Sequence, residues 1–240
     1  MMPFPRRKPL NAVLFLSTFS QESTTLEITL KLGEILRVAS AFRVTNLYWV
    51  NDYPEVRDVV NDVSSYALTP PYLKRLIPLK RNLKYVGLLP PINVQTHAVL
   101  KDPVEGEVRV VKKGETGLKV KLGAKYGHYL VVDSVQPKLS KYQGVYYSGP
   151  KVKIVTTIDE VYDGSLVVVG DRYGRDFWAL KDEIRQKYEE SGLTVIIGPP
   201  QGLKTEVRGL GVNFIRNQGV KDVRTEEALT SALALINAVI

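Results

Sequence analysis

Three segments in the last third of the chain carry the residue types best suited to binding a ligand. They are residues 170–174 (GDRYG), 198–202 (GPPQG) and 217–225 (NQGVKDVRT), and each follows a strand-like run. Glycine lets the backbone approach a ligand closely and leaves amides free to bind an adenine edge or a carboxylate. Each segment alone could be an ordinary turn. Because ligands bind beyond the carboxyl ends of strands in open α/β sheets, we expect the three to form one site.

Several other chemistries are excluded by what the chain lacks. It has no cysteine, which excludes disulfides, thiolate nucleophiles and cysteine-based zinc sites. His97 and His128 are its only histidines, so we expect no metal site. Neither a P-loop motif nor a G-x-G-x-x-G motif after the first strand is present. The chemistry of this site is therefore expected to need neither a metal nor a thiol adduct.

The charge balance indicates a polyanionic partner. The chain carries a formal net charge of +8 over 240 residues. Nucleic acid is the commonest such partner and an anionic membrane surface the second, although a basic protein without either partner is also compatible. The apolar runs at both ends are too short to span a bilayer, so we expect a soluble, cytoplasmic protein.

The first ninety residues alternate between strand-like and helix-like patterns. Residues 11–19 are apolar and predict a buried strand. The capping-box pair Thr24 and Glu27 predicts the start of a helix. Residues 44–51 predict a second strand and residues 55–68 a second helix. This order is typical of an α/β fold with a parallel sheet covered by helices.

The pattern changes between residues 94 and 150. Short alternating segments, VRVVKK, LKVKLG and HYLVVDSV, are separated by glycines, which predicts a small all-β unit, an OB-like barrel. Nine Lys or Arg and five Asp or Glu give this stretch half of the chain's excess charge. We expect an inserted RNA-binding β-barrel at 92–151, flanked by one discontinuous domain comprising 1–91 and 152–240.

The C-terminal part returns to the α/β pattern. VKIVTTI, SLVVVG and TVIIG predict strands, and residues 175–190 predict a helix. A last helix is expected from about Thr225 to Ile240, with Thr225 as its cap and Glu226 and Glu227 suited to the helix dipole.

The combination GDRYG, IIGPPQGL and NFIRNQGVKDVRTEEALTSALALIN resembles the three cofactor loops of SPOUT (trefoil-knot) RNA methyltransferases. It is similar in particular to an archaeal and eukaryotic family regarded as RNA uridine methyltransferases. The stretches TPPYLKR and LKRNLKYVGLLPPINVQTH resemble that family's lead into an inserted barrel, so the likeness covers nearly the whole chain. The first loop fits least well, because Asp171 and Arg172 stand where small hydroxyl residues are expected.

The resemblance implies a C-terminal trefoil knot, a homodimer and bound S-adenosyl-L-methionine. The residues that it implies for cofactor binding come from all three loops and their borders: Gly170, Ile197, Gly198, Pro199, Gly202, Asn217, Gln218, Gly219, Val223, Arg224, Thr225 and Ala228.

Methyl transfer to a nitrogen is an in-line displacement that needs alignment and exclusion of water. If the acceptor is N3 of uridine in ribosomal or transfer RNA, a base or a stabilising cation is also needed. Asp171 and Arg172 are weak candidates for this role, and Arg216 and Arg224 are others; the catalytic residue stays undetermined. For RNA binding we expect cations and one aromatic of the insertion: Lys112, Lys113, Lys119, Lys121, Lys125 and Tyr126.

Two other functions remain open from the sequence. The first is a non-catalytic RNA-binding protein that retains the SPOUT fold but lacks cofactor affinity. The second is an α/β enzyme acting on a small anionic metabolite, for which a basic β insertion would be unnecessary.

Overall fold

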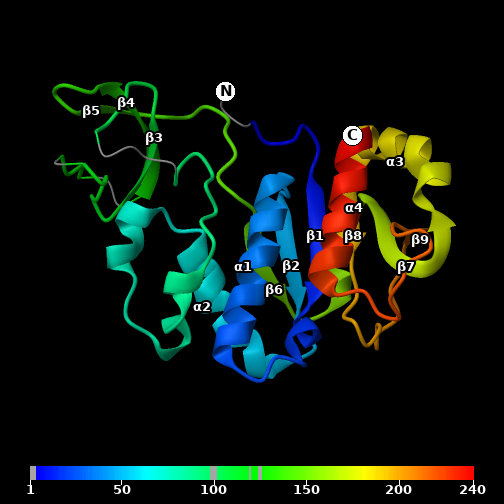
Figure 1. Ribbon diagram of the computed structural model, residues 1–240. Helices are drawn as coiled ribbons and strands as arrows, with labels where there is room; N and C mark the ends of the chain where they lie inside the picture. The colour runs from blue at the N-terminus through cyan, green and yellow to red at the C-terminus, as the bar shows by residue number, and fades with distance from the viewer. Residues whose placement is uncertain (1–3, 98–101, 119, 124–125) are drawn as a thin grey trace.

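A six-stranded parallel sheet with the strand order β6-β2-β1-β8-β7-β9 forms the centre of the computed structural model (Figure 1). The structure describes residues 4–97, 102–118, 120–123 and 126–240. The strands of this sheet are β1 (Leu10–Phe15), β2 (Asn46–Val50), β6 (Lys151–Val155), β7 (Leu166–Asp176), β8 (Leu193–Ile196) and β9 (Leu210–Asn213). The predicted α/β class and parallel sheet are therefore confirmed.

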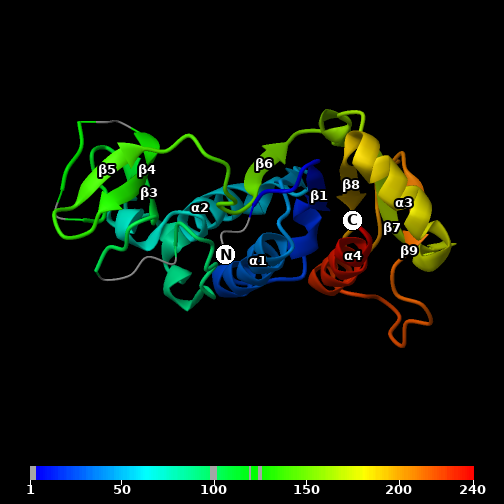
Figure 2. The same ribbon diagram turned by 90° about the horizontal axis from the view of Figure 1, so that it is seen from above.

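The four α-helices of the described residues contribute to one core on a single face of the sheet. They are α1 (Thr25–Ala41), α2 (Arg57–Ala67), α3 (Phe177–Ser191) and α4 (Thr225–Val239). Leu32 of α1, Ile184 of α3 and Leu233 of α4 are all fully buried in that core. Helices α1 and α4 run side by side, as Figures 1 and 2 show.

The other face of the sheet has a smaller core. Val13, Tyr48 and Ile196 point to this side and pack with Ile158 and Val161 of the 3-10 turn η6 (Ile158–Val161). Leu203 and Val207, from the chain between β8 and β9, complete it. On this face the sheet is therefore covered by η6 and by the chain between β8 and β9, and not by an α-helix.

The clearest differences between the predicted elements and the structure lie at two places. Residues 11–19 do not continue as one strand, because β1 ends at Phe15 and a 3-10 turn, η1 (Leu16–Phe19), follows. The whole stretch is buried, so burial alone did not separate strand from turn. The capping box of Thr24 and Glu27 forms as predicted. The second difference lies in the insertion.

The inserted segment contains a three-stranded antiparallel sheet in the order β3-β4-β5. Its strands are β3 (Val108–Lys112), β4 (Tyr126–Asp133) and β5 (Lys138–Lys141). The third strand comes from residues 138–141, whereas the described residues of LKVKLG form no strand. The predicted all-β character is confirmed for this sheet, and the closed OB-like barrel and the exact domain borders stay predictions.

This small sheet lies at the end of the molecule next to β6 and α2, away from β7 and β9 (Figures 1 and 2). The 3-10 turn η3 (Pro71–Leu76) joins it to the central sheet's domain, since the Tyr72 hydroxyl accepts from the Val110 amide at 2.8 Å. Within the described residues, no helix is long and apolar enough to cross a membrane.

Candidate active site

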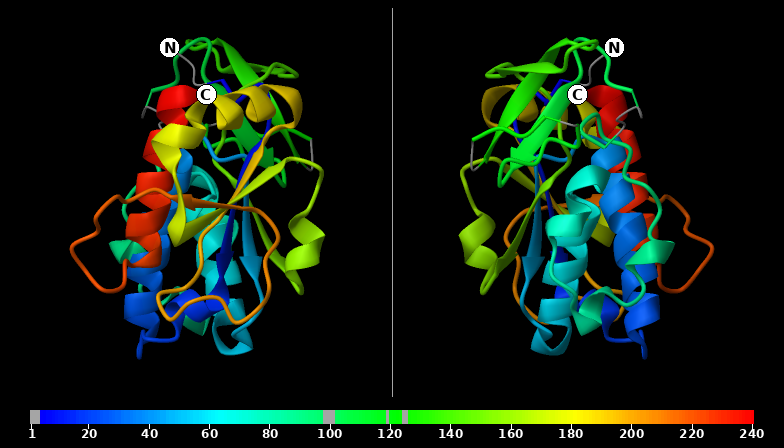
Figure 3. Two further views of the ribbon diagram at one scale, coloured as in Figure 1. Left: turned by 90° about the vertical axis from the view of Figure 1, so that its right-hand side faces the viewer. Right: turned by 90° about the vertical axis from the view of Figure 1, so that its left-hand side faces the viewer.

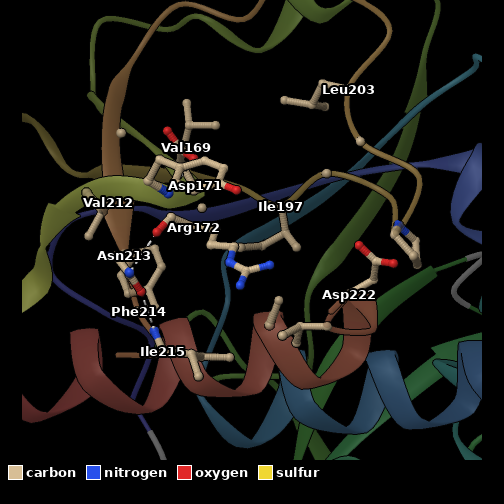
Figure 4. A pocket seen from close by; sticks show the side chains of 18 of the residues that line it. Val169, Asp171, Arg172, Ile197, Leu203, Val212, Asn213, Phe214, Ile215 and Asp222 are labelled. Carbon is tan, nitrogen blue, oxygen red and sulfur yellow. Dashed lines mark hydrogen bonds between the residues drawn. The ribbon is translucent and has the colours of Figure 1, made fainter. Parts of the chain in front are cut away.

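A cavity of about 700 Å³ opens at the carboxyl ends of β7, β8 and β9 and reaches the first turns of α4 (Figure 4). All three glycine-bearing loops contribute to its wall. The lining residues are Val169, Gly170, Asp171, Arg172, Tyr173, Ile197, Gly198, Pro199, Pro200, Gly202, Leu203, Val207, Gly209, Gly211, Val212, Asn213, Phe214, Ile215, Gln218, Lys221, Asp222, Val223 and Ala228. Segments far apart in the sequence thus meet around one space, as the parallel sheet predicts.

The first loop, 171–174, is a bulge within β7. Val212 of β9 pairs with Gly170 and again with Arg175, so the four residues between them leave the ladder. The Asp171 side chain accepts a hydrogen bond from the Tyr173 amide at 2.9 Å, which closes the loop on itself. Bulges of this kind redirect side chains at strand ends. Here the bulge projects Asp171 and Arg172 into the cavity.

Glycine is required on this loop because its backbone touches the neighbouring strands. A Cβ atom at Gly174 would lie 2.5 Å from the carbonyl carbon of Gly211, and one at Gly170 would lie 2.8 Å from Ile197 Cδ1. The first contact is with backbone and has no way to relax without moving β9. The absence of a side chain at these two glycines therefore allows β7 to lie close to its neighbours where the cavity begins.

The second loop is a tight turn that is hydrogen-bonded to η1, the 3-10 turn that follows β1. The Gly202 amide donates to the Pro199 carbonyl at 2.9 Å, and Gly202 has a φ of 86°. The Gln201 amide group donates to the Ser17 carbonyl at 3.0 Å. Leu203 packs against Gly198 and forms part of the apolar wall.

The third loop, between β9 and α4, stands out from the side of α4 (Figure 3). Its own side chains hold it together, since the Gln218 amide donates to the carbonyls of Val220 and Lys221 at 3.0 and 3.1 Å. Asn217 has a φ of 51°, a left-handed conformation that asparagine tolerates better than most residues. The Arg172 guanidinium donates to the Lys221 carbonyl at 3.1 Å and connects the first loop with the third.

Asn213 is a functional candidate that the sequence did not reveal. Its amide nitrogen donates to the Arg172 carbonyl at 2.8 Å, while its side-chain oxygen accepts from the Ile215 amide at 3.0 Å. One side chain thereby fixes both the first loop and the exit of β9. Only the register shift between β7 and β9 brings it there, and nothing in the local sequence indicates that shift.

The charged groups of the cavity are Asp171, Arg172, Lys221 and Asp222. Asp222 makes no hydrogen bond or ion pair with the described residues, whereas one oxygen of Asp171 is taken up by the Tyr173 amide. In Figure 4 the side chains of Arg172 and Asp222 both extend into the space between the first loop and α4. Among the described residues, no group of three His, Asp or Glu side chains is arranged to hold a metal ion.

Of the twelve predicted cofactor residues, eight line the cavity: Gly170, Ile197, Gly198, Pro199, Gly202, Gln218, Val223 and Ala228. The other four, Asn217, Gly219, Arg224 and Thr225, belong to the third loop and the start of α4 but are not part of its wall. The apolar residues Val169, Leu203, Val207, Val212, Phe214 and Ile215, which line it as well, were not foreseen. They occupy ordinary strand and loop positions with no distinguishing pattern.

The prediction that Thr225 caps the last helix is wrong. Arg224 occupies the N-cap position, and its amide donates to the Glu227 carboxylate at 3.0 Å. Thr225 is 1% exposed, and its hydroxyl lies 3.4 Å from the Gly198 carbonyl and 3.2 Å from the Thr18 hydroxyl. A tertiary contact with the second loop thus replaces the local cap.

Arg216 is directed away from the cavity toward another partner. Its guanidinium forms an ion pair with Asp176 at 2.6 Å, and Asp176 also caps α3 by accepting from the Trp178 amide. Arg216 does not line the cavity, and neither does Arg224. Asp171 and Arg172 are therefore the two catalytic candidates from the sequence that reach it.

The predicted RNA-binding residues lie on the insertion. Lys112 and Lys113 are exposed at the end of β3, and Tyr126 stands opposite Lys112 on β4 with 65% of its surface exposed. Lys121 is exposed too but lies 3.5 Å from Glu115. Lys119 and Lys125 fall outside the described residues.

Residues 14–121 match the family described as "Putative RNA methyltransferase". This match supports RNA methyltransferase activity for the chain. The match agrees with the RNA methyltransferase activity expected from the sequence, whereas the SPOUT class and the inserted barrel stay predictions. The matched range ends before β7, so the roles of the C-terminal cavity depend on its geometry.

Two similar proteins align with nearly the whole chain. The "Uncharacterized protein rrnAC1612" of Haloarcula marismortui is 28% identical over 278 aligned positions, covering 94% of this chain and 98% of that protein. The SpoU methyltransferase AviRb of Streptomyces viridochromogenes superposes with a TM-score of 0.40 and 11% identity. That alignment covers 98% of this chain and 61% of the other, so the chain spans less than two thirds of that protein.

Proposed function

We propose that this RNA methyltransferase transfers the methyl group of S-adenosyl-L-methionine to a base nitrogen of ribosomal or transfer RNA, with N3 of uridine favoured. The observation that carries the proposal is the meeting of three glycine-bearing loops around one cavity at the carboxyl ends of β7, β8 and β9. Parallel sheets bind nucleotide-like ligands at this edge.

The residues of the cavity fit the cofactor in size and chemistry. A cavity of about 700 Å³ lies within the range of small-molecule sites, roughly 300–1,000 Å³. Val169, Ile197, Val223 and Ala228 offer apolar surface for an adenine ring, and Gly198 brings its backbone to the cavity wall. When bound, S-adenosyl-L-methionine would supply the activated methyl group. The loops would orient it and keep water away from the acceptor.

The acceptor nitrogen of uridine must lose its proton, and three side chains of the cavity can assist. Asp171 and Asp222 are the carboxylates that could take the proton, and Asp222 has both oxygens free of partners among the described residues. Arg172 could stabilise the negative charge that develops on the base. Among the described residues, none that lines the cavity is a cysteine, serine, threonine or histidine, and the proposed reaction includes no covalent enzyme intermediate.

The remaining parts of the proposal concern RNA binding, the details of the fold, the oligomeric state and the location of the protein. The basic insertion would bind RNA through Lys112, Lys113, Lys121 and Tyr126, together with Lys119 and Lys125 from outside the described residues. The trefoil knot, the OB-like barrel, a homodimer and a cytoplasmic location follow from the resemblance to SPOUT enzymes and belong to the proposal. Sedimentation at several protein concentrations would test the dimer.

Incubation with S-adenosyl-L-methionine labelled in its methyl group and with total RNA, followed by nucleoside mass spectrometry, tests the activity. We expect label in a methylated pyrimidine, with N3-methyluridine as the leading product. A double variant, Asp171→Asn with Asp222→Asn, should lose the label and keep the cofactor bound. RNA binding without label and without cofactor binding would instead support the alternative, an RNA-binding protein that retains the fold.

A further inference from the structure

A second, smaller pocket lies where the insertion joins the methyltransferase domain. It has a volume of about 170 Å³ and is lined on one side by Leu68, Thr69 and Leu73, at the end of α2 and in η3. Lys112 of β3, and Tyr126 and His128 of β4, form the other side. A cavity of roughly 150 Å³ in another protein holds one benzene ring, so this pocket has room for a single flat ring.

The wall formed by β4 is aromatic and partly open to solvent. Tyr126 and His128 lie two positions apart on the same face of the strand, with ring centroids 5.6 Å apart at an interplanar angle of 77°. Tyr146 also packs against His128 in a T-shaped arrangement, with ring centroids 5.2 Å apart at an interplanar angle of 75°. Because Tyr126 is 65% exposed while His128 is backed by Tyr146, the tyrosine presents a free ring surface beside a fixed wall.

His128 can also recognise the polar edge of a ligand. Burial lowers the pKa of its imidazole, so the ring is neutral near pH 7 and offers one donor and one acceptor. Neither ring nitrogen has a hydrogen-bond partner among the described residues. Nucleobases combine a stacking face with such donor and acceptor groups at their edges.

The cations beside the pocket are free for phosphate. Lys112 and Lys113 form no ion pair with the described residues, whereas neighbouring Lys121 and Arg75 both pair with Glu115. Lys112 stands directly opposite Tyr126 in the β3–β4 ladder. A free cation at the mouth of an aromatic pocket complements an unpaired base together with its adjacent phosphate.

We propose that this junction pocket binds one unpaired nucleobase of the RNA, stacked on Tyr126, with Lys112 on a flanking phosphate. The inference rests on the proposed function, since it takes RNA as the substrate. Strands β3 and β4, which line the pocket, lie at one end of the molecule, and strands β7 and β9, which line the cavity, lie at the other (Figure 2). The base held here is therefore a second nucleotide that anchors the RNA, distinct from the one methylated in the cavity of the same chain.

Fluorescence anisotropy with a labelled single-stranded ten-nucleotide oligouridylate and with a ten-base-pair RNA duplex tests the pocket. Tyr126→Ala should weaken single-strand binding by about 5- to 150-fold, the usual loss for one stacked base. Tyr126→Phe keeps the ring and should stay within about twofold of wild type. Duplex binding should be the same for all three proteins, because paired bases are not available for stacking.

Equal losses on single strand and duplex, or no loss in Tyr126→Ala, would overturn the proposal. Lys112→Gln provides a second test, since loss of one phosphate contact should reduce the log–log salt slope on the single strand by about 0.7. An unchanged slope would contradict the role of Lys112. Calorimetry with S-adenosyl-L-methionine separates the two proposals: wild type and Tyr126→Ala should bind it equally, and absence of binding in both would count against the methyltransferase site alone.

Discussion

The two ends of the molecule differ in the groups that they offer to a ligand. At the carboxyl ends of β7, β8 and β9 the loops are fixed by backbone contacts and by glycines that permit them, such as Gly174 against Gly211. On the insertion, lysines and aromatic rings project from an antiparallel sheet. The first end suits a small ligand of defined shape, and the second suits a long polyanion. This difference predicts that substitutions will separate cofactor binding from RNA binding.

The largest effect is expected for Gly174→Ala. Its added methyl group would lie 2.5 Å from the carbonyl carbon of Gly211, so β7 and β9 must separate at the edge of the cavity. A displacement on the order of 1 Å in a catalytic site can cost about 100-fold in rate. We expect a loss of about that size in methyl transfer, measured with labelled cofactor, and little change in binding of the single-stranded oligouridylate.

Gly87→Ala is the matched control. A methyl group added at Gly87 would meet no atom within 4 Å, and the backbone there is not left-handed, so both activities should stay at the wild-type level. If Gly174→Ala behaved like this control, the close approach of β7 to β9 would not be needed for the site.

A smaller effect is expected for Asn213→Ala. This change removes two hydrogen bonds, to the Arg172 carbonyl and from the Ile215 amide, each worth about 1 kcal/mol. We expect kcat to fall by about tenfold while KM for RNA is unchanged, because Asn213 holds Arg172 and does not touch the insertion. Asn213→Asp keeps the acceptor for Ile215 and should recover part of kcat; no recovery, or a change confined to KM, would contradict this positioning role.

A modest effect, on RNA binding by the insertion, is expected for Lys113→Gln. Lys113 is exposed and free of ion pairs with the described residues. Its removal should lower the salt slope of single-strand binding by about 0.7 and leave the heat of cofactor binding unchanged. The control is Lys187→Gln on α3, whose cation pairs with Glu190 and lies outside both sites. A similar slope change in both variants would show that net charge, not position, governs RNA binding.

The smallest effect concerns pH. His97 and His128 lie at the start of the insertion and in β4, and burial lowers the pKa of both; the charge of Lys74 also lowers that of His97. In the unfolded chain each histidine protonates near pH 6.5. The stability that depends on neutral imidazoles is therefore complete above that pH, and it is lost as the pH falls from there through the lower pKa of each ring in the folded state. Hydrogen exchange, corrected for intrinsic rates, should therefore accelerate in β3 and β4 between about pH 7.5 and 5.5 but not in β7 and β8. Replacing both histidines by glutamine should abolish the difference, and equal acceleration in both sheets would contradict it.

Much of the fold could be predicted because local signals and tertiary structure agree. The capping box at Thr24 and the alternation of strands and helices both indicated the parallel sheet that forms. The convergence of the three loops followed from that topology, since the carboxyl ends of parallel strands lie at one edge of the sheet.

The remaining features depend on tertiary contacts that no local pattern records. The bulge at 171–174 and the role of Asn213 arise from the register between β7 and β9. Threonine is a common N-cap residue, but the Thr225 hydroxyl instead contacts the Gly198 carbonyl and the Thr18 hydroxyl. β1 ends at Phe15, yet the next four residues are buried as well. A run of buried residues therefore could not show where the strand ends and the turn begins.

The central claim is that the loops around β7, β8 and β9 form a site for S-adenosyl-L-methionine. Isothermal titration calorimetry of the full chain measures this directly, with Gly174→Ala as the comparison. We predict saturable binding of one cofactor per chain that Gly174→Ala weakens strongly and Tyr126→Ala leaves intact. Absence of heat at near-millimolar protein and cofactor, or equal binding by Gly174→Ala, would contradict the claim.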